Sequence, residues 1–102
     1  MVLLYKDREL TEVIEELHFG TVEVGKSETL TVFILNETDA SFFIDDIEFN
    51  PDERGLEVMS APNALAAREI QPIMIRWSPP LSLRRALVTK IHIVGREVYV
   101  AR

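Results

Sequence analysis

The stretch that decides the fold is residues 17–36, LHFGTVEVGKSETLTVFILN. In its second half Leu30, Val32 and Ile34 share one face of an extended chain, because side chains alternate along a strand. The other face carries threonine, phenylalanine and leucine. This alternation predicts a strand over residues 27–36 that is buried on one face and partly covered on the second.

Short runs of the same kind recur along the chain. Val, Ile and Thr, which strands favour, occupy 25 of the 102 positions. Turn signals separate the runs at fairly even intervals, which is typical of an all-β sandwich. Further strands are predicted at residues 41–50, 56–60, 70–77, 86–94 and 97–100.

Three local patterns refine this prediction. Residues 41–50 change character along their length, which predicts a bulge or a partly covered edge. Gly95 and Arg96 fit the two-residue turn of a type II′ hairpin. Residues 10–17, LTEVIEEL, carry apolar positions at helical spacing, but their β-branched residues favour extended structure.

The predicted fold is an antiparallel immunoglobulin-like β-sandwich of roughly seven to nine strands. A chain of 102 residues fits a single domain over residues 1–102, with residues 1–16 as an extra N-terminal strand or arm. The residues expected in the core are Trp77, Val32, Ile34, Ile75 and Ile91.

Composition excludes several classes of protein. There is no Cys, hence no disulfide, thiolate metal ligand or Cys nucleophile. No apolar run approaches the roughly 20 residues that span a bilayer, and the start MVLLYKDREL meets charge too early for a secretory signal. We therefore expect neither export nor a membrane partner.

Charge is unevenly distributed. The net charge of −6 opposes binding to nucleic acid. Residues 1–57 hold 15 acids and 4 Lys or Arg, net −11, whereas residues 58–102 hold 2 acids and 7 Lys or Arg, net +5. Either acidic and basic strands become neighbours within the fold, or a dipolar surface docks onto copies of the chain or onto a partner of opposite sign.

A group of turn residues carries a family resemblance. One strand ends in Phe19-Gly20, the chain continues to Val24-Gly25, and the next strand closes on Asn36. This order resembles the opening of an ASH-type immunoglobulin-like domain, a family named for abnormal-spindle and Hydin proteins and akin to the major sperm protein and PapD-like sandwiches. Independently of the resemblance, glycines supply turn angles and Asn can bond backbone at a strand exit.

The resemblance extends over about residues 17–100. The family usually has a strand ending in Phe-x-Pro, where this chain has Trp77-Ser78-Pro79. Two departures stand out: residues 83–86, LRRA, lack the usual Gly, and the 16 leading residues exceed the common domain start.

The leading segment suggests a setting. Residues 2–25 look like small immunoglobulin-like proteins of tailed bacteriophage particles. This likeness implies a non-enzymatic virion component, such as a capsid decoration, neck or tail accessory protein. Its expected partners are copies of itself and a major virion structural protein, in a virion assembled in the host cytoplasm. The alternative is a cytoplasmic ASH-type adaptor that binds a peptide or protein partner at a sheet edge.

Candidate catalytic and metal-ligating residues are few. His18 and His92 are the only histidines, and neither has an evident catalytic partner in the sequence. Acidic residues cluster within residues 45–57, but their spacing does not match a calcium loop and a solvated rim is favoured. No nucleotide-binding motif is present, so no enzyme, metal or cofactor is predicted. A calcium-dependent carbohydrate module is disfavoured because no aromatic platform is visible.

The main candidate site is the apolar start of the chain. Four consecutive residues, Val2, Leu3, Leu4 and Tyr5, cannot all enter one core in an extended chain. Either they form an internal strand covered on both sides, or they leave an edge or apolar patch that pairs with another subunit.

Phe42, Arg84 and Arg85 complete the candidate partner-binding set. Phe42 is adjacent to Phe43, so a strand points the two rings to opposite faces, and Phe42 is assigned to the surface. Arg84 and Arg85 are assigned to contact with an acidic protein surface.

Overall fold

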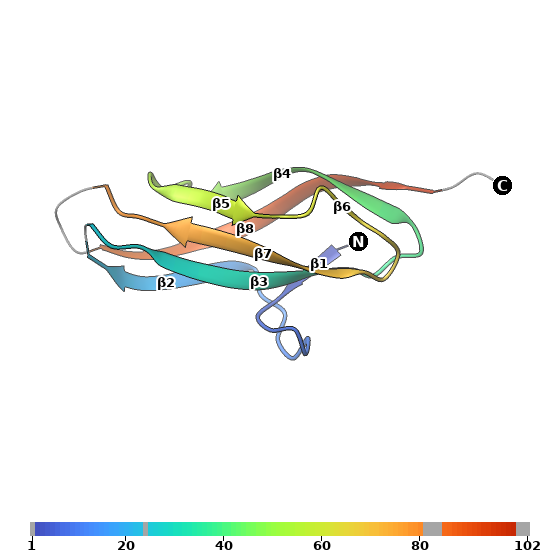
Figure 1. Ribbon diagram of the computed structural model, residues 1–102, viewed down its shortest axis with the longest axis horizontal. Coiled ribbons are helices and arrows are strands. Elements are labelled where there is room, and N and C mark those ends of the chain that lie inside the picture. Colours follow the sequence, from blue (N-terminus) through green and yellow to red (C-terminus); the bar gives the residue numbers. More distant parts are fainter. Residues whose placement is uncertain (1, 24, 81–84, 100–102) are drawn as a thin grey trace.

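The computed structural model describes residues 2–23, 25–80 and 85–99 and confirms the predicted immunoglobulin-like sandwich (Figure 1). Two antiparallel four-stranded sheets pack together: a first sheet in the order β1-β3-β7-β5 and a second in the order β2-β8-β4-β6. Within the described ranges no helix could cross a membrane. The strands are β1 (Val2–Tyr5), β2 (Glu16–Val22), β3 (Glu28–Asn36), β4 (Ser41–Asn50), β5 (Leu56–Ser60), β6 (Ala64–Leu65), β7 (Ile70–Trp77) and β8 (Arg85–Val98).

Strand β3 is the deciding stretch of the sequence, and it lies in the middle of the first sheet. It pairs with β7 from Glu28↔Trp77 to Leu35↔Ile70. Its inward face is buried and its outward face is partly covered or exposed, as the alternation predicts. The strand predicted at residues 70–77 coincides with β7.

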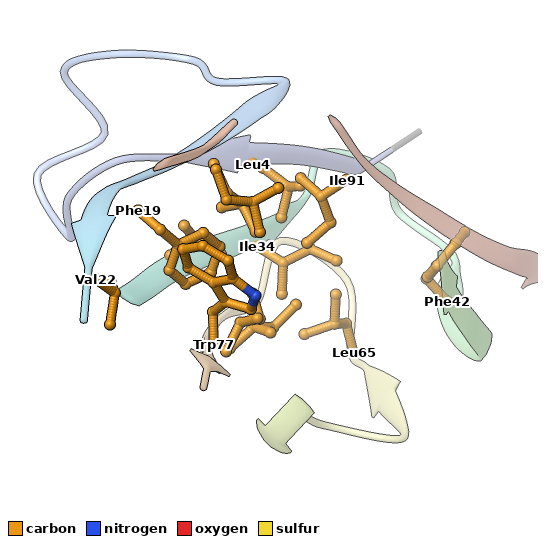
Figure 2. Close-up of a cluster of buried hydrophobic side chains, with 13 residues drawn as sticks. Leu4, Phe19, Val22, Ile34, Phe42, Leu65, Trp77 and Ile91 are labelled. Carbon is orange, nitrogen blue, oxygen red and sulfur yellow. The ribbon is translucent and has the colours of Figure 1, made fainter. Parts of the chain in front are cut away.

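The core fills the space between the sheets. The rings of Phe19 and Trp77 lie 6.0 Å apart at 58°, a tilted contact, and Figure 2 shows both gathered with Ile34 near the centre. Burying one such side chain contributes about 1.5–3 kcal/mol. All five residues expected in the core are buried: Trp77, Val32, Ile34, Ile75 and Ile91.

Asn36 is a polar side chain buried as deeply as the apolar core, at 0% exposed. Its Nδ2 donates to the carbonyls of Ala40 at 2.8 Å and Ala66 at 3.0 Å. Its Oδ1 accepts from Thr38, from the backbone N–H at 3.1 Å and the hydroxyl at 2.8 Å. Asn36 thus ties the end of β3 to the next turn and to the residue after β6.

The sequence predicts a hairpin turn at Gly95-Arg96, and this prediction is wrong. Strand β8 runs from Arg85 to Val98, and β4 pairs with it across this point. Gly95 serves close packing instead. A Cβ there would lie 2.3 Å from the carbonyl oxygen of Phe43 and 2.5 Å from the ring of Phe42. The glycine therefore lets two strands approach over a buried ring.

The predicted bulge in residues 41–50 is confirmed. The register of β4 against β8 shifts between Ile44 and Asp46. One extra residue changes which alternate positions face inward. As a result Phe42, before the bulge, faces the core together with Ile47 and Phe49, which follow it.

The N-terminal segment changes sheets. Strand β1 pairs with β3 in the first sheet, whereas β2 pairs with β8 in the second. Residues 10–17 form no helix, and extended structure is confirmed over part of them: Val13 bridges back to Tyr5 and β2 begins at Glu16. The connecting loop projects from the side of the sandwich (Figure 1).

Candidate partner-binding surfaces

Strand β1 contributes to both the core and the surface. Leu4 is 7% exposed and Val2 packs against the core, while Leu3 and Tyr5 keep part of their surface in solvent. Alternation therefore divides the four candidate residues between two environments, and a deletion of this strand would also remove core.

The free side of β1 is partly occupied by the chain itself. The N–H of Ile14 donates to the carbonyl of Leu4 at 2.9 Å, and the N–H of Lys6 donates to the carbonyl of Glu12 at 3.0 Å. These bonds leave little of the β1 edge for strand addition. The part of β1 that remains open to solvent is instead its outward face, which carries Leu3 and Tyr5.

The outward residues of β1 join a larger apolar surface. Residues opposite each other in neighbouring strands point to the same face. Leu3 is opposite Leu35, and Tyr5 is opposite Phe33. On strand β7, Ile70 lies opposite Leu35 and Pro72 lies opposite Phe33. Met74 follows on the same face of β7, opposite Thr31. We call this surface the apolar face; it consists of Leu3, Tyr5, Phe33, Leu35, Ile70, Pro72 and Met74.

Charged residues border the apolar face, and one of them covers part of it at Phe33. The guanidinium of Arg8 lies 5.0 Å from the centre of the Phe33 ring, a cation–π contact at one side. On the far side Arg76 donates to Glu57 at 2.9 Å, across β7 and β5. An apolar centre with charges at its rim is the usual composition of a protein interface.

Phe42 is corrected from a surface residue to a core residue. It is 6% exposed, whereas Phe43 is 37% exposed. The bulge after Ile44 is the physical reason, because without it Phe43 would share the inward face of Ile47. Phe43 instead lies under Arg96, whose guanidinium is 5.6 Å from the ring centre.

Of the other two candidate residues, only Arg85 lies within the described part of the chain, and it is in the second sheet rather than in the first. Arg85 begins β8 and pairs with Val22 at the edge of the second sheet. Arg84 lies outside the described residues, so its assignment to a partner contact remains a prediction.

Part of the uneven charge of the chain is neutralised by contacts within the fold. Three ion pairs join a base from the second half to an acid from the first: Arg68–Asp39, Arg76–Glu57 and Arg96–Asp45. This arrangement agrees with the interpretation in which acidic and basic segments become neighbours within the fold. Because the pairs are exposed, each contributes at most about 1 kcal/mol.

The acidic segment at residues 45–57 lies beside a groove between β4 and β5. Asp46, Glu48 and Asp52 line it together with Lys90 and His92. In the described part of the chain, no three carboxylate or imidazole groups come together as metal ligands would. His18 and His92 are both exposed on the second sheet.

Asp7, Glu69 and Glu97 each have a carboxyl pKa below the usual value, and Asp7 is the one that lies in the N-terminal loop. The hydroxyl of Thr11 and, next, its backbone N–H donate to Asp7 and lower the pKa of that carboxyl below its usual 3.8. The contact closes the loop between β1 and β2, so it is structural.

Sequence reasoning found only part of the apolar face. Leu3 and Tyr5 were candidates, and Phe33 and Leu35 were recognised as a partly covered second face. Ile70, Pro72 and Met74 were missed as surface residues, because their contribution depends on the register between β3 and β7.

Comparison with known proteins places the chain in a family. The chain matches no curated protein and no solved structure significantly. Residues 10–90 match the family described as ASH: Abnormal spindle-like microcephaly-assoc'd, ASPM-SPD-2-Hydin. ASH domains are immunoglobulin-like protein-interaction folds. This match covers well over half of the sequence and agrees with both the resemblance in the turn residues and the sandwich fold. The chain therefore belongs to the ASH family.

Proposed function

We propose that this ASH domain is a non-enzymatic structural protein that assembles with copies of itself through the apolar face. The observation that carries the proposal is the set of seven apolar side chains aligned across β1, β3 and β7 on the outside of the first sheet. Met74 is exposed and the other six are partly exposed, and a contiguous apolar surface of this kind is typical of interaction sites.

A second copy suits this surface because of charge. The chain carries a net charge of −6, so most approaches of two copies bring like charges together. The apolar face itself contains no charged side chain. Homodimer interfaces are also more apolar than transient ones, and a two-fold contact presents the same patch from both copies.

The proposed setting is a bacteriophage virion, where the domain would act as a decoration, neck or tail accessory protein. The support for this setting is the likeness of the leading segment to small immunoglobulin-like virion proteins. A major virion structural protein is then a second partner of the same surface.

Light scattering behind a sizing column tests self-assembly, at low and at high salt. We expect a discrete oligomer that persists at high salt, because apolar burial is not screened whereas exposed charge pairs are. A monomer under both conditions would overturn the proposal. An oligomer that dissociates in salt would assign the contact to charges rather than to the apolar face.

A second candidate function is favoured by a different observation. Strand β1 covers only the Phe33–Asn36 half of β3, so the other half is an open sheet edge. An open edge is the feature to which an extended peptide adds as a further strand. We therefore also propose an adaptor role, set in the cytoplasm, in which this edge receives a partner segment.

A further inference from the structure

The open half of β3 has backbone groups directed toward solvent. Strand β7 lies on one side of Glu28–Val32, and no described residue pairs with that stretch on the other side. The N–H of Asn36 donates to the carbonyl of Glu69 on the β7 side at 3.0 Å. Since backbone groups alternate between sides, those of Thr29 and Thr31 face the open side.

A groove runs beside this open edge. It has a volume of about 670 Å³ and lies where the N-terminal segment crosses from the first sheet to the second. Ile14, Leu17, Leu30 and Val32 give it an apolar lining. Leu17 and Val32 are 1% and 3% exposed, so they belong to the core and form a fixed floor.

The wall of the groove is acidic. Glu12, Glu15 and Glu16 line it together with Lys6, so three carboxylates face one ammonium group. The Nζ of Lys6 lies 3.9 Å from Glu12, which leaves Glu15 and Glu16 as the negative part of the wall. Both are exposed.

We propose that this groove binds an extended segment of a partner protein in which apolar and basic residues alternate. The inference rests on the adaptor role proposed above and names its ligand. The segment adds to the open edge of β3 at Thr29 and Thr31, in line with β1. Its apolar side chains cover Ile14 and Leu30, which are only partly buried, and its Lys or Arg side chains lay their stems along the groove and reach the glutamates.

Titration with synthetic peptides, followed by amide NMR of the full chain, tests the proposal. The probe is an acetylated, amidated hexapeptide of alternating lysine and valine, and the matched control replaces each lysine with glutamate. We expect the lysine peptide to shift the amides of Thr29 and Thr31 and to bind at least about tenfold more tightly than the glutamate peptide. N-methylation of the lysines should weaken binding roughly tenfold or more, because the residues directly opposite Thr29 and Thr31 in an antiparallel pair donate the strand hydrogen bonds.

Two variants locate the contact on the protein. Thr31→Pro removes an N–H that faces the open side and leaves the ladder with β7 in place, so the chain should fold but no longer bind. Glu15→Gln combined with Glu16→Gln should weaken the lysine peptide several-fold without affecting the fold, and this pair keeps the test valid if the proline variant unfolds.

The outcomes distinguish docking at the β3 edge from the preference for a basic segment. If neither peptide shifts Thr29 and Thr31, edge docking itself is overturned, and the adaptor role with it. If both peptides bind equally at these amides, edge docking holds and the preference for a basic segment is overturned.

Discussion

The outer faces of the two sheets differ in chemistry, although both sheets cover the same core. On the second sheet Glu16 is opposite Lys90, Glu48 is opposite His92, and Asp45 pairs with Arg96. The corresponding surface of the first sheet is the apolar face. An antiparallel sheet commonly packs one face on the core and leaves the other to water.

The second sheet shows that this sandwich folds with a largely charged outer surface, on which Phe43, Val88 and Val98 are also exposed. The apolar side chains outside the first sheet are therefore not required by the core, and most of them do not pack against it. A contiguous apolar surface that folding does not require is typical of interaction sites, and it supports the proposed contact with another molecule. The predictions below separate residues that serve the core from residues that serve this contact.

The largest effect is expected from neighbouring residues of β3 that point in opposite directions. Ile34 is 0% exposed in the core, whereas Leu35 belongs to the apolar face. Ile34→Ala should lower the free energy of unfolding by about 3 kcal/mol, because it leaves a cavity. Leu35→Ala should cost less than about 1 kcal/mol in dilute monomer. Urea denaturation measures both, and equal losses would contradict the division of β3 into a core face and a contact face.

A somewhat smaller effect is expected in the second sheet at Gly95. Gly95→Ala places a methyl group against the carbonyl of Phe43 and the ring of Phe42. Overpacking of this kind costs about 1–3 kcal/mol. Thermal unfolding measures the loss, and Gly20→Ala is a useful comparison because a Cβ there meets no atom within 4 Å, although its φ of +68° adds strain. A Gly95 variant as stable as the parent would contradict the close packing of β4 against β8 at this point.

Most of the fold could be predicted from the sequence, because hydrophobic alternation and turn residues are local. Residues 70–77 are an example: their predicted bounds coincide with β7. The turn at Gly95 could not be predicted correctly, because glycine in a turn and glycine beneath a packed ring look alike in sequence. The difference depends on β4, which is about 50 residues distant in the chain.

The candidate site was predictable only in part, for the same reason. Alternation separates Phe42 from Phe43 but cannot say which one is buried, since the bulge near Asp45 decides it. Likewise, the sequence shows that Leu3 and Tyr5 are apolar. That they share one surface with Ile70 and Met74 depends on the register of β1 against β3 and of β3 against β7. Pairing between distant strands is the information that local patterns lack.

A small effect is expected from the charged outer surface of the second sheet. Arg96→Gln removes the exposed ion pair with Asp45 and the contact with the Phe43 ring. The loss in unfolding free energy should stay below about 1 kcal/mol and should shrink in high salt. Denaturation at two salt concentrations checks this. A loss comparable with that of Ile34→Ala would contradict the view that this surface is only solvated.

The smallest effect concerns the loop between β1 and β2, beside the apolar face. The hydrogen bonds from Thr11 lower the pKa of Asp7 in the folded state, so they stabilise the fold above the usual carboxyl pKa of 3.8 and lose this effect as pH falls through the lowered value. Asp7→Asn should slightly lower the Tm at pH 7, and the difference from the parent should vanish in strong acid. A difference that persists unchanged at low pH would mean that the carboxylate charge is not involved.

The role of the apolar face is tested most directly by one matched pair of variants in light scattering. Met74 and Val88 are comparably exposed, at 39% and 46%, on the outer faces of the first and second sheets. Met74→Lys and Val88→Lys add the same charge and remove one apolar side chain each. We predict that Met74→Lys converts the oligomer to a monomer while Val88→Lys keeps the mass of the parent. Equal behaviour of the two variants, or dissociation by Val88→Lys alone, would contradict the assignment of the contact to the first sheet.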